Sequence, residues 1–282
     1  MIEFLTSAAR AAGFLVISVG LCWTGKKARE LVPQWRRPPG CGPAGSEACA
    51  ISEGSYYIGA MLSLGGPVSW ASPSVSQGFA EALLFGLLAV LLLNASVLIA
   101  ERTYLARWKL PEGVAEGDRG AALAEGAHYI ALGLMIMGAS WGDSGGPAVM
   151  LFFWLLGQAF LGLGVTAYGK LFRIDPAGQL AARNLPAALS LAGAVIAFGN
   201  ASRAAISGPF LGCGRSTLDA AGFFIFAFAA LLGARHLADL WLFPNATFNR
   251  EIFQAKEPSR SAAVLDASLF IGVSILLGWA IS

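Results

Sequence analysis

Residues 78–100 read GFAEALLFGLLAVLLLNASVLIA, an apolar run in which Glu81 is the only charged side chain. A bilayer core about 30 Å thick is crossed by roughly 20 mainly apolar residues in helical form. The run is long enough and apolar enough to cross a membrane. It predicts a transmembrane helix rather than the buried helix of a soluble domain.

Other stretches of the chain have the same character, and the whole composition agrees with them. The sequence is 56% hydrophobic and 13% charged, whereas soluble domains carry about 25% charged residues. We therefore predict an all-α, polytopic membrane helical bundle of about seven transmembrane helices. The predicted spans are Phe4–Trp23, Gly78–Ala100, Ala121–Ser140, Ala148–Leu171, Leu185–Ala205, Ala220–Phe243 and Ala262–Ser282.

Lysine and arginine gather in the loops that follow the second, fourth and sixth predicted spans. These loops contain Arg102, Arg107, Lys109, Arg119, Lys170, Arg173, Arg183, Arg250, Lys256 and Arg260. Short cytoplasmic loops carry an excess of such residues, so these loops are predicted to be cytoplasmic. Seven spans then give a cytoplasmic N-terminus and a periplasmic C-terminus in a bacterial inner membrane.

The segment 26–77 fits this orientation poorly. It should lie outside the cytoplasm, yet it begins with a basic cluster, Lys26, Lys27, Arg29, Arg36 and Arg37. An eighth, short crossing at Tyr56–Ser72 would keep that cluster inside. Glycine and proline at residues 65–67 interrupt this stretch, which favours a re-entrant or interfacial segment instead.

The cysteines support the outer placement of this segment. In the seven-span arrangement Cys22, Cys41, Cys49 and Cys213 all fall at or beyond the outer face, and disulfides persist in an oxidising compartment. Four cysteines allow three connectivities. The short loop between Cys41 and Cys49 is rich in proline and glycine, and we predict a disulfide there.

An internal repeat organises the rest of the chain into three helical hairpins, whose loops contain Pro111, Pro176 and Pro244. Similar triplets open the returning helices and bring Glu125, Leu191 and Asp266 into register. The predicted division is a transmembrane helix over 1–25, an extracytoplasmic loop over 26–77, and hairpin repeats over 78–145, 146–216 and 217–282.

Two stretches resemble a known family. Residues 239–244, DLWLFP, are similar to the end of the first helix in the domain of unknown function 350, a bacterial inner-membrane family. Residues 183–193, RNLPAALSLAG, resemble the opening of its second helix. The resemblance is best over 148–282 and does not cover the first 77 residues. It implies tandem two-helix membrane units and brings no activity, cofactor or catalytic residue.

Ionisable side chains within the spans form the candidate site, because such groups are costly in lipid and point to function by default. Glu125 is expected to pair with His128 on the same helix face, and Asp266 with Arg235 or His236. Arg235 and Asp239 can also pair along their helix. The candidate intramembrane polar site is Glu125, His128, Arg235, His236, Asp239 and Asp266.

No cofactor, metal centre or enzyme active site is predicted. The Glu-x-x-His spacing of Glu125 and His128 occurs in metal-binding bundles, but a second such pair is missing. Residues 142–147, GDSGGP, match the motif around a serine-protease nucleophile. A triad needs a base beside Ser144, and both histidines are expected near the opposite membrane face.

The sequence favours a non-enzymatic accessory or scaffold subunit that acts through helix–helix association in a larger membrane assembly. The alternative is an ion- or proton-coupled transporter or channel that uses the polar residues. The expected partners are the lipid bilayer and other membrane subunits or further copies of the chain. A formal charge of +2 gives no reason to expect nucleic acid.

Overall fold

A computed structural model describes residues 2–31, 46–70, 72, 74–141, 146–243 and 246–281. Within these ranges seven helices are long and apolar enough to cross a membrane. The predicted all-α polytopic bundle is thereby confirmed. The seven helices are α1 (Ile2–Glu30), α4 (Val75–Arg102), α6 (Arg119–Ala139), α7 (Gly146–Leu171), α9 (Leu185–Ile206), α10 (Cys213–Leu242) and α11 (Arg260–Ile281).

Shorter helices lie between the long ones. They are α2 (Glu47–Ser63), α3 (Gly65–Ser69), α5 (Leu110–Ala115), α8 (Pro176–Ala181) and the π-helical turn η2 (Arg250–Gln254). The last three lie in the basic hairpin loops, and each loop ends at a capping side chain. Asp118 accepts from the Gly120 N–H, Asn184 from Ala187 and Ser259 from Ala262. These caps satisfy backbone donors and fix where α6, α9 and α11 begin.

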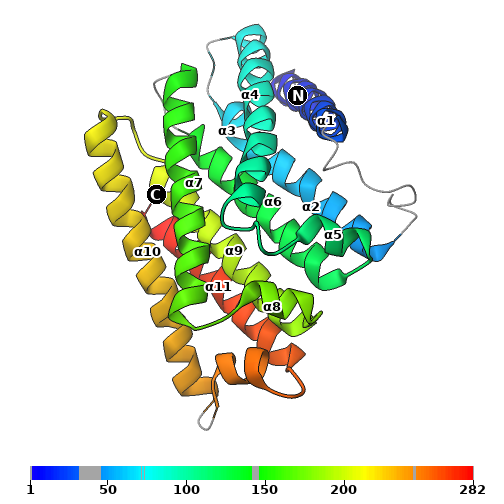
Figure 1. Ribbon diagram of the computed structural model, residues 1–282. Helices are drawn as coiled ribbons and strands as arrows, with labels where there is room; N and C mark the ends of the chain where they lie inside the picture. Colours follow the sequence, from blue (N-terminus) through cyan, green and yellow to red (C-terminus); the bar gives the residue numbers. More distant parts are fainter. Residues whose placement is uncertain are drawn as a thin grey trace.

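Helices α2, α6, α9 and α11 form an inner layer and pack side by side in that order. In Figure 1, α4, α7 and α10 run steeply through the view, and the inner helices cross them at an angle. The apolar windows of α6 and α9 are each 78% buried, whereas that of α10 is 22% buried. Helices α6 and α9 are therefore shielded, whereas α10 faces the surroundings, as does much of α11, whose apolar window is 33% buried.

Small residues allow the inner helices to touch backbone to backbone. A Cβ atom on Gly133 of α6 would overlap the backbone of Gly59 in α2. A Cβ atom on Gly193 of α9 would overlap Ala267 of α11 in the same way. Close approach of this kind supplies the van der Waals packing that holds helices together in lipid.

The α2–α3 segment runs alongside α6 from one end to the other, in the same direction. At one end Arg119 Nη2 lies 2.5 Å from Glu47 Oε2. At the other end Trp70 Nε1 donates to the Ser140 carbonyl oxygen at 3.0 Å. The sequence favoured a re-entrant or interfacial segment here, whereas the structure gives it the same length and direction as a spanning helix.

Helix α9 is also parallel to α6. Gly120, at the start of α6, contacts Ala188 at the start of α9, and Gly138 near the end of α6 contacts Arg203 near the end of α9. The inner layer therefore contains neighbours that all run the same way, and α4, α7 and α10 return in the opposite direction.

Helix α11 continues this parallel arrangement against α9. Gly193 contacts Ala267, and farther along both helices Asn200 Nδ2 donates to the Ser274 carbonyl oxygen at 2.8 Å.

Two sequence predictions fall outside the described residues. Cys41 lies in the stretch 32–45, so the Cys41–Cys49 disulfide stays a prediction. Asp143 and Ser144 of the GDSGGP motif lie in the stretch 142–145.

Candidate functional site

Asp266 of α11 and Arg235 of α10 form a buried ion pair. Their side chains are 0% and 1% exposed, and Arg235 Nε lies 2.8 Å from Asp266 Oδ1. Ser190 of α9 donates from Oγ to Asp266 Oδ2 at 2.5 Å. The expected pairing of Asp266 with Arg235 is confirmed, and Ser190 ties α9 into the same cluster.

Aromatic rings enclose the Arg235 guanidinium. Its Cζ lies 4.3 Å from the centre of the Phe172 ring and 5.7 Å from the rings of Tyr168 and Phe248. Ring faces attract a cation, more strongly when both are shielded from water. The guanidinium is therefore held by α7 and the loop before α11 as well as by Asp266.

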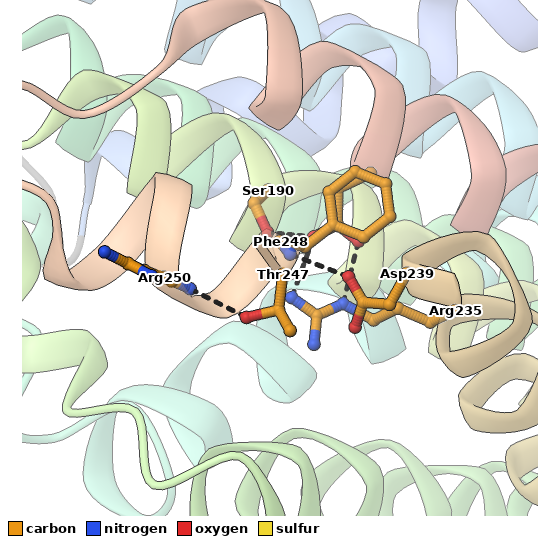
Figure 2. Close-up of polar contacts among 7 residues, drawn as sticks. Ser190, Arg235, Asp239, Thr247, Phe248 and Arg250 are labelled. Atoms are coloured by element: carbon orange, nitrogen blue, oxygen red, sulfur yellow. Dashed lines mark hydrogen bonds and ion pairs between the residues drawn. The ribbon is translucent and has the colours of Figure 1, made fainter. Parts of the chain in front are cut away.

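Asp239 joins this cluster in a different way from the one expected (Figure 2). Its Oδ1 accepts a hydrogen bond from the Phe248 backbone N–H at 2.7 Å, which secures the loop that follows α10. The Arg235 guanidinium is instead bonded to Asp266 on another helix. His236 is exposed on α10, so the alternative pairing of Asp266 with His236 is wrong.

Glu125 of α6 lies in a second buried cluster with α1 and α2. Its carboxylate accepts a hydrogen bond from Ser52 Oγ. Arg29, at the end of α1, donates to the Tyr129 hydroxyl, and its Cζ lies 4.7 Å from the centre of the Tyr129 ring and 5.0 Å from that of Tyr56. Glu125 lies within electrostatic range of Arg29.

His128 does not pair with Glu125, so that expectation was wrong. Its Nε2 lies 3.3 Å from the Tyr104 hydroxyl, just beyond the end of α4. Positions three apart on a helix differ by about 60° around its axis. That difference is enough to direct Glu125 toward Ser52 of α2 while His128 faces the α4–α5 connection.

The two carboxyls occupy equivalent places. Glu125 is six residues beyond the start of α6 at Arg119, and Asp266 is six residues beyond the start of α11 at Arg260. Their serine partners, Ser52 and Ser190, are each five residues beyond the starts of α2 and α9. The repeat alignment from the sequence placed Leu191 in register with Glu125 and Asp266. The residue of α9 that contacts Asp266 is the preceding one, Ser190.

The sequence analysis did not predict several members of these clusters, namely Ser52, Ser190, Arg29 and the tyrosines. Ser52 and Ser190 are small polar residues on helices rich in glycine and alanine. No feature of the sequence distinguishes them from the other serines of the chain. A polar contact between α4 and α7 is of the same kind. Trp154 Nε1 and Gln158 Nε2 both donate to Ser96 Oγ, at 2.7 and 2.5 Å.

The geometry binds helices together. Each carboxylate accepts from a serine on the neighbouring inner helix, and Asp266 also binds an arginine from the outer layer. The described residues contain no group of three or more His, Cys, Asp and Glu side chains that could hold a metal ion. Glu125 and Asp266 lie in separate clusters rather than in one shared cavity.

Fold and site together define a polytopic helical membrane protein whose buried charges are paired across helices. The family model of the Domain of Unknown Function (DUF350) matches the chain twice, over residues 4–140 and 144–281. The chain therefore belongs to this family. The first match includes most of the 77 residues that the resemblance had left out. No curated protein and no solved structure matches the chain.

Proposed function

We propose that this protein is a non-enzymatic accessory or scaffold subunit of a bacterial inner-membrane assembly. The observation that carries the proposal is the Arg235–Asp266 pair, buried to 1% and 0% exposure. A carboxylate that already binds an arginine and a serine is engaged in packing. Carrying a proton or an ion would require that pair to separate in a low-dielectric interior, at considerable cost.

The outer surface supports a role in association. Helix α10 crosses the bundle with little of its apolar window buried and presents large apolar side chains along its length. These side chains include Leu218, Phe223, Ile225, Phe226, Leu237 and Leu240. Such a face can lie against lipid or against a helix of another membrane subunit, including a second copy of the chain, while the inner layer keeps its shape.

We also propose that the chain crosses the membrane eight times, an arrangement that the parallel packing of α2–α3 and α6 supports. If α6 spans the bilayer, α2–α3 spans it in the same direction, because the two run side by side over their whole length. A helix of 17 residues, such as α2, is within the range that spans a bilayer. Lys26, Lys27 and Arg29, in the last turns of α1, then lie on the same side of the membrane as the basic loops, in accord with the charge bias of that side.

This arrangement departs from the expected cytoplasmic N-terminus. Both termini would face the periplasm, and the end of α1 and the start of α2 would face the cytoplasm. The predicted Cys41–Cys49 disulfide belongs to the seven-crossing arrangement, because it was inferred from an oxidising outer compartment.

Purification tests the scaffold proposal. The full-length protein, tagged and expressed from its own locus, should be recovered from mild detergent with the same membrane protein in constant ratio, or as a defined oligomer. Crosslinking in intact membranes before solubilisation guards against losses in detergent. A protein that remains a single chain under crosslinking would contradict the proposal.

A transporter is the second candidate, and one observation favours it. Arg235 Nη1 is buried and has no hydrogen-bond partner within the described residues, as expected beside an internal water molecule, which a proton path would need. Flux of protons or cations into proteoliposomes would support this candidate if Glu125→Gln and Asp266→Asn abolished it without preventing assembly. Equal flux in these variants and the unsubstituted protein would exclude the carboxyls from transport.

A further inference from the structure

A groove of about 380 Å³ opens between the α4–α5 connection and the cytoplasmic end of α7. Its lining is half apolar and half polar in character. The polar and aromatic members of the lining are Tyr104, Arg107, Trp108, Thr166, Lys170 and Asp175. The clusters described above do not use this groove.

The wall of the groove is firmly held. The Tyr104 ring lies against Gly162 of α7, where a Cβ atom would come within 2.9 Å of it. Its hydroxyl contacts His128 Nε2, and burial raises the pKa of that hydroxyl far above its usual range. Trp108, which is 9% exposed, completes the wall. The groove therefore does not depend on a side chain that is free to move away.

Two cations line the groove and are available to a ligand. Arg107 and Lys170 are both exposed, and neither forms an ion pair with any residue that the structure describes. Asp175 is the single acidic side chain of the lining, which leaves a net charge of +1 from two cations and one carboxylate. The Asp175 carboxylate is turned toward Gly178 of α8.

The position of the groove matches the headgroup layer of a bilayer. Lys170 lies in the last turn of α7, and Tyr104 follows the end of α4 by two residues. Along α7, Thr166 and Lys170 continue the face on which Leu155 and Leu163 are 59% and 63% exposed. A molecule in the groove would thus be continuous with the lipid that covers this face, and tryptophan is common at that depth.

We infer that the groove binds the phosphate group of an anionic membrane lipid. Arg107 and Lys170 would contact the phosphate oxygens, the first as a bidentate donor and the second as a point charge. Thr166 lies in the lining to donate a further hydrogen bond, and the acyl chains would extend along the exposed face of α7. Basic pockets between spans on the cytoplasmic side recognise lipid headgroups in this way.

Native mass spectrometry of the full-length protein tests the inference. The protein is exchanged into mixed micelles that contain phosphatidylglycerol and phosphatidylcholine in equal amounts. Adducts of phosphatidylglycerol should dominate and should fall on the order of tenfold in the double variant Arg107→Gln/Lys170→Gln. The matched control, Arg250→Gln/Lys256→Gln, removes two exposed charges from another basic loop and should retain the adducts.

Equal loss of adducts in the two double variants would overturn the inference, because the attraction would then be a diffuse property of the basic surface. Equal retention of the neutral and anionic lipids would overturn it as well. A third arm adds excess inorganic phosphate. Phosphatidylglycerol adducts that persist on the unsubstituted protein would support the lipid as the occupant. Their complete replacement by phosphate adducts would overturn the inference in favour of a site for soluble phosphate.

Discussion

The Asp266 cluster and the Glu125 cluster each hold a buried carboxylate in one of the two regions that the family model matches. Each places a carboxylate one and a half turns into a parallel inner helix. In each, the carboxylate binds a serine of the neighbouring inner helix, Ser190 of α9 for Asp266 and Ser52 of α2 for Glu125. The arginines differ in origin. Arg235 comes from α10, the third long helix of its repeat, whereas Arg29 comes from the end of α1.

That difference shows which part of the arrangement belongs to the repeat. The serine–carboxylate contact joins α2 to α6 and α9 to α11 at matching positions, so it is common to the two regions that the family model matches, residues 4–140 and 144–281. The positive charge has been supplied separately in each half. We therefore expect substitutions at the shared contact to have equal effects in both repeats, and substitutions at the arginines to have effects of their own.

Breaking the Arg235–Asp266 pair should have the largest effect. Arg235→Met leaves a carboxylate buried without its cation, which should lower the free energy of unfolding by about 3–5 kcal/mol. The double variant Arg235→Met/Asp266→Leu should recover most of that loss. Unfolding in mixed detergent micelles measures both. A double variant as unstable as the single one would show that the pair is not the source of the loss.

The next largest loss of stability is expected from larger side chains placed where two helix backbones touch. Gly133→Val pushes α6 away from α2, and Gly193→Val pushes α9 away from α11, each with a cost of about 1–3 kcal/mol from overpacking. Gly272→Val serves as the control, because a Cβ atom there meets nothing within 4 Å. Thermal unfolding of the three variants should separate the first two from the third. Equal behaviour of all three would contradict the close contacts.

Removing the serine hydroxyl that contacts each buried carboxylate should give the smallest loss of stability. It also compares the two clusters most directly, because the same group is removed from each. Ser52→Ala and Ser190→Ala each delete one hydrogen bond to a buried carboxylate, with an expected loss of about 1 kcal/mol. The two losses should agree within experimental error in the same unfolding assay. A large loss at one serine and none at the other would mean that the contacts are not equivalent.

Much of the fold was predictable because a helix long enough and apolar enough to cross a membrane can be recognised from its hydrophobicity alone. The ends of the seven long helices were predicted to within three residues, except that α1 extends to Glu30 rather than Trp23 and α10 begins at Cys213 rather than Ala220. A further exception is α2, whose sequence EACAISEGSYYIGAMLS is interrupted by polar and small residues. It lies between other helices, where small residues permit close packing, so it does not need the hydrophobicity on which prediction depends.

The members of the site that could be predicted are those with ionisable side chains, because such residues are rare within transmembrane spans. Asp266 and Arg235 could be paired because few ionisable residues are available inside the spans. The partner of Glu125 could not be found in this way, because Ser52 lies on α2, which the sequence analysis interpreted as part of a re-entrant or interfacial segment. Parallel packing of helices far apart in sequence also decides that Ser190, rather than Leu191, meets Asp266.

The parallel inner layer is tested most directly by locating both ends of the chain in intact cells. Epitope tags are placed at the N-terminus and at the C-terminus of separate full-length proteins, and each is probed from the periplasm before and after the membrane is permeabilised. Eight crossings predict that both tags are accessible from the periplasm. An N-terminal tag that becomes accessible only after permeabilisation, with the C-terminal tag accessible throughout, would contradict the crossing of α2–α3.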